Sequence, residues 1–155
     1  MRPLLAAILL ISLGVAPVAA DSVGFAGSIL DSCSLSLATS GTLAMSLDGT
    51  VLGSEESGGQ PAQVTILSTG SHSVTVAAPT LVTSPAGYDP TGQQVEVAYQ
   101  GQSLLSGVSQ PYTGAGTSFP VATIALSSLA INNRIRNARG FASGSYATQT
   151  VVTCN

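Results

Sequence analysis

Positive charge is almost missing from this chain. Its 155 residues include no lysine, four arginines and one histidine, against seven acidic residues, for a net charge of −3. Nucleic-acid binding needs a basic face that neutralises phosphates, and electrostatic binding to anionic lipid needs a basic cluster. We therefore expect neither nucleic acid nor a charged membrane surface as a partner.

Histidine, cysteine and paired acids are too few, or wrongly placed, for common catalytic and metal sites. His72 lies between Ser71 and Ser73, but no G-x-S-x-G motif or second orienting motif accompanies it. Two cysteines with one histidine make a poor zinc site. The pair Glu55 and Glu56 lies in a glycine-rich stretch that we interpret as a solvated loop rather than a calcium site. We expect no enzyme, no metal and no cofactor.

Only one long apolar run occurs, at residues 4–15, after Arg2. Pro17 ends it, and small residues follow at positions 18–20, which is typical of a secretory signal peptide. We expect residues 1–20 to be removed and residues 21–155 to form one domain. No later segment is apolar and long enough to span a bilayer, so the mature chain should not insert into a membrane. This predicts a secreted protein of the periplasm or cell surface.

The two cysteines are Cys33 and Cys154. An even count in an oxidising compartment predicts a disulfide, and the long spacing excludes a C-x-x-C redox motif. Closing so long a loop would stabilise the fold by about 4–5 kcal/mol in the chain-entropy model. Two free thiols are the alternative.

A period of two runs through the beginning of the expected mature chain. Seven odd-numbered positions carry its apolar or small residues: Val23, Phe25, Gly27, Ile29, Cys33, Leu35 and Leu37. Such alternation predicts one strand, or two strands joined by a bulge near Asp31, with a buried face that includes Cys33.

Short strands with turn residues between them continue to the C-terminus. We expect strands at residues 42–47, 51–52, 62–67, 73–78, 93–99, 119–126 and 145–154. Residues 68–71 are interpreted as a hairpin turn and residues 107–118 as a loop. Residues 130–138 are the best helical alternative, but the alternation around them favours a strand. The pattern predicts an all-β, immunoglobulin-like β-sandwich of about seven to nine strands.

Three arginines carry the positive charge of residues 21–155. Arg134 and Arg136 share a strand face, with Arg139 close by, so they could meet an acidic partner or the chain's own acids. The alternative is a solvated edge strand that its charge protects from aggregation.

Two segments resemble the pilin domains of the bacterial chaperone–usher route, including the spore-coat-U-like group. Residues 25–29 with Cys33 resemble the F-x-G-x-[IV] strand and following cysteine of those domains. Residues 144–153 are similar to their G-x-Y-x-x-x-x-x-V-T closing strand, in which Tyr146 and Val152 are the matching positions.

The resemblance implies an incomplete sandwich that lacks its last strand, which a neighbour's N-terminal segment supplies. Val23, Phe25, Gly27 and Ile29 would be the first strand or the donated segment. Like subunits and a periplasmic chaperone would be partners, and the function would be assembly of a surface appendage or envelope layer for adhesion or biofilm. The alternative is a self-contained secreted binding module that uses the loops at residues 54–59, 79–90 and 107–118.

Overall fold

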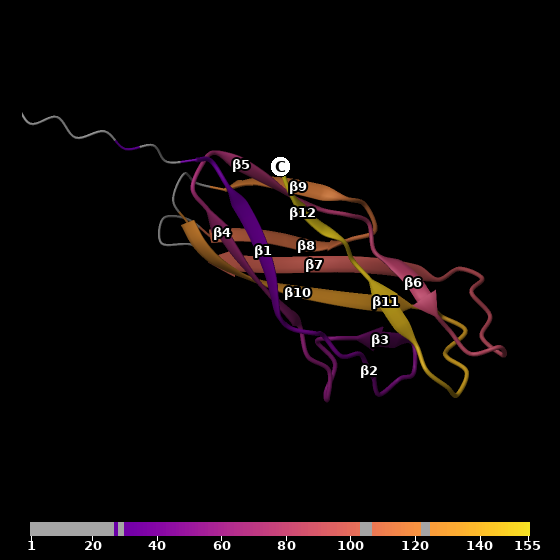
Figure 1. The fold of residues 1–155 in the computed structure, drawn as a ribbon. Coiled ribbons are helices and arrows are strands. Elements are labelled where there is room, and N and C mark those ends of the chain that lie inside the picture. Colours follow the sequence, from indigo (N-terminus) through magenta and orange to yellow (C-terminus); the bar gives the residue numbers. More distant parts are fainter. Residues whose placement is uncertain (1–26, 28–29, 103–106, 122–124) are drawn as a thin grey trace, which may run out of the picture.

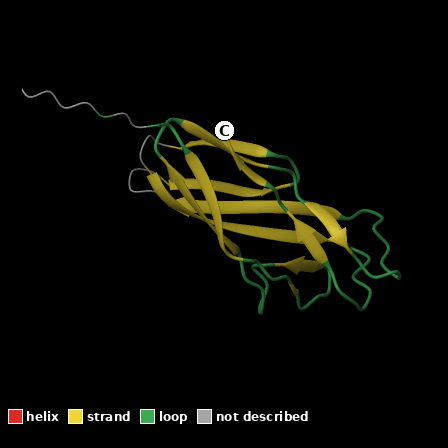
Figure 2. Ribbon diagram, viewed as in Figure 1, coloured by secondary structure: helices red, strands yellow, loops and turns green. Residues whose placement is uncertain are grey.

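A computed structural model describes residue 27 and residues 30–102, 107–121 and 125–155. These residues form strands and loops, with no helix among them (Figure 2). The strands are β1 (Cys33–Thr39), β2 (Ala44–Met45), β3 (Val51–Gly53), β4 (Ala62–Ser68), β5 (His72–Val76), β6 (Thr80–Thr83), β7 (Gln94–Gln102), β8 (Gly107–Thr113), β9 (Thr117–Val121), β10 (Ala125–Arg136), β11 (Ala147–Gln149) and β12 (Val152–Cys154). The all-β sandwich is confirmed, but its described residues form twelve strands and not seven to nine.

The larger layer is a seven-stranded antiparallel sheet built around β10. One edge of β10 pairs with β4 and then with β3, and its other edge pairs with β7. Outside these lie β1 on β4, β2 on β3 and β8 on β7. The helical alternative for residues 130–138 is wrong, because Leu129, Ile131 and Ile135 alternate toward the core as a strand requires. The arginines therefore lie on or beside a central strand, and the edge-strand interpretation is also wrong.

The opposing layer consists of β12-β5-β9 and the separate pair β11-β6 (Figure 1). Buried side chains of both layers fill the space between them: Val64, Ile66, Val74, Val76, Val97, Tyr99, Val121, Leu129 and Ile131. The hydroxyl groups of Tyr99 and Thr117 also share a hydrogen bond of 2.8 Å between the layers. These contacts make one continuous core.

Two connections differ from the sequence prediction. Residues 68–71 are not a hairpin turn, because β4 pairs with β1 and β10 whereas β5 pairs with β9 and β12. A Ser-Thr-Gly-Ser sequence favours a tight turn but does not determine whether the flanking strands pair. Residues 107–118 are not a loop but form β8 and the start of β9. β8 tolerates Pro111 because, in the described part of the chain, it pairs with β7 alone, and the register shifts beside the proline.

The expected closing strand at residues 145–154 is divided. Its first part, β11, pairs with β6, and its second part, β12, pairs with β5. The predicted disulfide is confirmed: Cys33 and Cys154 are bonded, with their Cα atoms 6.1 Å apart. The predicted signal peptide and Val23, Phe25 and Ile29 lie outside the described residues.

Candidate functional site

The inner face of β1 is only partly covered. Cys33, Leu35 and Leu37 alternate toward the opposing layer, and the first two are half-buried against the core. Leu37 continues the same face but is 61% exposed. A leucine on the inner face of a sandwich normally packs against the other sheet. The exposure of Leu37 therefore marks a place where covering structure is missing among the described residues.

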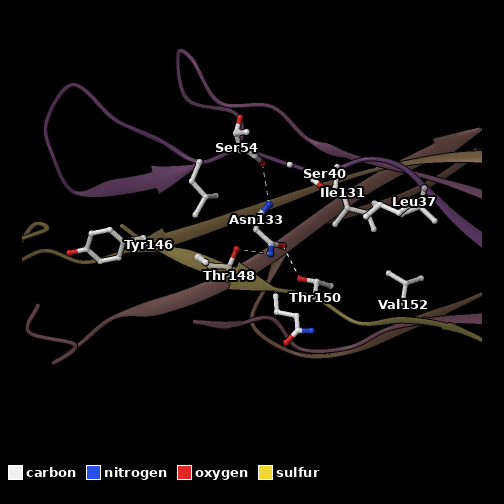
Figure 3. Close-up of a pocket in the computed structure, with 16 residues that line it drawn as sticks. Leu37, Ser40, Ser54, Ile131, Asn133, Tyr146, Thr148, Thr150 and Val152 are labelled. Carbon is white, nitrogen blue, oxygen red and sulfur yellow. Dashed lines mark hydrogen bonds between the residues drawn. The ribbon is translucent and has the colours of Figure 1, made fainter. Parts of the chain in front are cut away.

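Leu37 borders a groove of about 530 Å³ between the layers. Ala62, Val64 and Ile131 line it from the large sheet, and Val152 lines it from β12 (Figure 3). The remaining lining residues are Ser40, Gly41, Thr42, Leu43, Ser54, Asn133, Tyr146, Ala147, Thr148, Gln149 and Thr150. The site is thus an open apolar channel with a polar part toward β11.

Strand edges border the groove on both sides. Among the described residues, β1 pairs only with β4, and β12 pairs only with β5. Each strand therefore keeps one edge on which backbone N–H and C=O groups have no ladder partner, and such edges are templates for another strand. The groove offers an incoming strand both hydrogen-bonding edges and an apolar floor.

The Cys33–Cys154 bridge closes one end of this groove. A strand between two others needs them to lie about 9–10 Å apart, twice the usual strand spacing. The Cα atoms of Cys33 and Cys154 are 6.1 Å apart, which leaves no room for a third strand at that level. The groove therefore opens only away from the bridge, toward Leu37 and β11.

Asn133 forms the polar part of the groove. Its Nδ2 donates a hydrogen bond of 3.0 Å to Thr148 Oγ1, and its Oδ1 accepts one of 2.9 Å from Thr150 Oγ1 (Figure 3). These bonds tie β10 to the segment around β11 across the gap between the layers. The amide is thereby occupied on both sides, and the spacing of the groove walls is fixed.

Three aromatic rings lie at the end of the groove remote from the bridge. Tyr146, which lines the groove, packs edge-on against Tyr88 and Phe141 with ring centroids 5.2 and 5.4 Å apart. Its hydroxyl donates to the carbonyl oxygen of Ala142. This cluster packs the loop before β7 against the loop before β11.

A charged cluster lies around Arg134. Arg134 Nε donates to Glu96 Oε2 at 2.8 Å, and its guanidinium lies 3.7 Å from the centre of the Tyr112 ring. Burial raises the pKa of Tyr112, and the hydrogen bond and negative charge of Glu55 raise it further. Arg139 pairs with Asp89. Two of the three arginines thus meet the chain's own acids, one of the outcomes that the sequence left open.

The other residues considered for chemistry do not gather into a site. His72 lies on β5, and its buried Nε2 has no hydrogen-bond partner among the residues that the structure describes. In the part of the chain that the structure describes, no three or more His, Cys, Asp and Glu side chains group as metal ligands. Within the same residues, no helix is long and apolar enough to cross a membrane.

The structure brings together four of the residues that the sequence singled out. Tyr146 and Val152 line the groove, and Cys33 and Cys154 close its end. Gly27 lies apart: it is exposed, and a Cβ added to it would meet no atom within 4 Å. Sequence reasoning placed Leu37 on the inner face but did not foresee its exposure, and it missed Asn133.

Comparison of the chain with family models, curated proteins and solved structures found no match. The groove and the sequence patterns are therefore the features that point to a function.

Proposed function

We propose that this protein is a secreted structural subunit of a bacterial surface appendage or envelope layer, completed by an extended strand from a neighbouring subunit. The observation that carries the proposal is Leu37, exposed on the inner face of β1 above an apolar groove. Adding a strand to exposed sheet edges is a general mode of peptide recognition, in which backbone bonds give affinity and side-chain pockets give specificity.

The occupant that fits is the N-terminal segment of residues 22–30. Val23, Phe25 and Ile29 alternate with small or polar residues, so an extended strand would present all three to one side. Nine extended residues span about 30 Å. Burying three such apolar side chains stabilises a complex by roughly 1.5–3 kcal/mol each before the cost of ordering the strand.

The resemblance to chaperone–usher pilin domains supports the same conclusion, since those domains lack a strand at a groove of this kind. An apolar leader and a disulfide fit export to an oxidising compartment, where a periplasmic chaperone would protect the open groove. The alternative of a self-contained binding module is less well supported, because two of its three expected recognition loops contain strands: β6 in residues 79–90, and β8 with the start of β9 in residues 107–118.

A peptide-binding experiment tests the proposal. The full chain carrying Phe25→Asp and Ile29→Asp, produced in an oxidising periplasm, cannot donate its own segment and serves as the acceptor. We expect a fluorescent peptide of residues 22–30 to bind it, and the same peptide with both aspartates not to bind.

Matched groove variants make the test specific. Leu37→Arg in this acceptor should abolish binding, because it places a charge in the apolar groove. Leu67→Arg should leave binding unchanged, because Leu67 is exposed on β4 with the parity opposite to the core residues Val64 and Ile66. If the peptide fails to bind, or if both arginine variants bind it equally, strand complementation at this groove is wrong.

A further inference from the structure

The residues just before β1 are anchored at the bridge end of the sandwich. The backbone N–H of Thr69 donates to Ser32 O, and Thr69 Oγ1 accepts from the backbone N–H of Ser32, both at 2.9 Å. The same hydroxyl donates to Leu30 O at 2.9 Å. Asp31 also lies close to Gly70, since a Cβ added to Gly70 would come within 2.6 Å of Asp31 Cγ. The pairing of β1 with β4 thus continues past Cys33 onto the connection that leaves β4.

This anchor and the bridge lie together at the closed end of the groove. Cys33 follows Ser32 directly, and its bond to Cys154 holds β1 and β12 too close for an intervening strand. A segment that turned back after Leu30 would meet the bridge before it reached the groove. It would also have to break the hydrogen bond from Thr69 Oγ1 to Leu30 O.

We propose, on the basis of the function proposed above, that the Cys33–Cys154 bridge and the Thr69 anchor prevent the chain from filling its own groove, so that residues 22–30 complete a second copy of the chain. The bridge therefore determines the partner as well as stabilising the fold. The donated strand enters from the open end near Leu37, and its first residues point toward the acceptor's bridge.

This direction determines how copies assemble. β12 runs from Val152 toward the bridge at Cys154. The donated strand runs the other way, because its N-terminus lies near the acceptor's bridge and its C-terminal end, Leu30, lies at the open end. The two strands are therefore antiparallel, which is the more stable pairing. The bridge end of one copy then faces the open end of the next, and such head-to-tail contacts build rings or open filaments rather than closed dimers.

A linker insertion tests the inference without removing the disulfide. A flexible Gly/Ser linker of about 16 residues between Leu30 and Asp31 spans roughly 20–24 Å, comparable to the length of β1, and would let the segment pass the bridge. The control carries the same linker between Ala20 and Asp21, which lengthens the chain but leaves the anchor intact. Both are produced in an oxidising periplasm, and their masses in solution are measured beside the unmodified chain.

We expect the unmodified chain and the control to form ladders of multimers, and the inserted chain to be a monomer that no longer binds the peptide of residues 22–30. Adding Phe25→Asp and Ile29→Asp to the inserted chain should restore peptide binding and lower its melting temperature, which separates self-insertion from misfolding. Multimers of equal size from the inserted chain and the control would overturn the inference alone. An absence of multimers from all three chains, with no peptide binding, would overturn the proposed function as well.

Discussion

Thr150 Oγ1 donates a hydrogen bond of 2.9 Å to Asn133 Oδ1, and this bond joins the central strand of one layer to the segment between β11 and β12 of the other. Thr148 accepts from the same amide at 3.0 Å. Asn133, Thr148 and Thr150 all line the groove, so these two bonds connect its walls directly. Asn133 therefore sets the spacing of the groove.

Replacing Asn133 by alanine should lower the free energy of unfolding by about 1–3 kcal/mol, because two hydrogen bonds of about 1 kcal/mol each are lost and two hydroxyl groups lose their partner. Thr150→Val should cost about 1 kcal/mol. In urea unfolding, the double variant should be less destabilised than the sum of the single variants by at least about 0.5 kcal/mol.

Thr153→Val is the control for this cycle. Thr153 is exposed on β12 with the opposite parity, so the substitution should change stability by less than about 0.5 kcal/mol and should be additive with Asn133→Ala. Additivity between Asn133→Ala and Thr150→Val would show that the bond does not couple the two walls.

Local periodicity predicted most of the strands and their buried faces, but not β6 and β8, which lie in segments expected to be loops. Tyr146, Thr148, Thr150, Val152 and Cys154 share a parity in the sequence, and all five are half-buried in the structure. Periodicity could not predict that Thr148 and Thr150 contact Asn133, because that contact depends on how the two layers stack. It also could not predict that a strand turns away after Ser68 instead of pairing with the next strand, since both arrangements use the same turn residues.

The exposure of Leu37 could not be predicted from the sequence for a related reason. The alternation of Cys33, Leu35 and Leu37 predicts one inner face, and the structure confirms it. Whether a neighbouring strand covers that face depends on pairings between residues far apart in the chain. The groove exists because, among the described residues, no strand pairs with the free edges of β1 and β12. No local sequence pattern predicts this.

Arg134 is the residue at which a lysine should fail as a replacement. Its Nε donates to Glu96 while its guanidinium lies 3.7 Å from the centre of the Tyr112 ring, and only 27% of its side chain is exposed. A lysine keeps the charge but cannot make the directed bond and the stacking contact together. Arg134→Lys should lower the free energy of unfolding by about 1–3 kcal/mol.

Arg136→Lys is the matched control on the same strand. Arg136 is exposed, and its replacement should change stability by less than about 0.5 kcal/mol. Urea unfolding at neutral pH measures the free energy of unfolding of both variants. Equal stability of the two would mean that the cluster around Arg134 is held by charge alone.

Tyr112 should make the protein lose stability at alkaline pH. Burial raises its pKa above the ordinary value of about 10, and the hydrogen bond and charge of Glu55 raise it further. The folded protein thus keeps the phenolic proton at a pH where the unfolded chain releases it. The resulting stabilisation is complete below about pH 10 and falls as the pH rises above it.

Tyr112→Phe should remove this contribution, so the free energy of unfolding should fall less steeply above pH 10 in the variant than in the natural chain. The slopes are compared rather than the absolute values, because the variant also loses the bond to Glu55 and should be less stable at pH 8. Tyr146, whose pKa burial also raises, remains in both proteins and contributes equally to both slopes. Identical slopes from pH 8 to 12 would show that the Tyr112 proton is not held by the fold, and that the cluster formed by Tyr112, Glu55 and Arg134 is open to water.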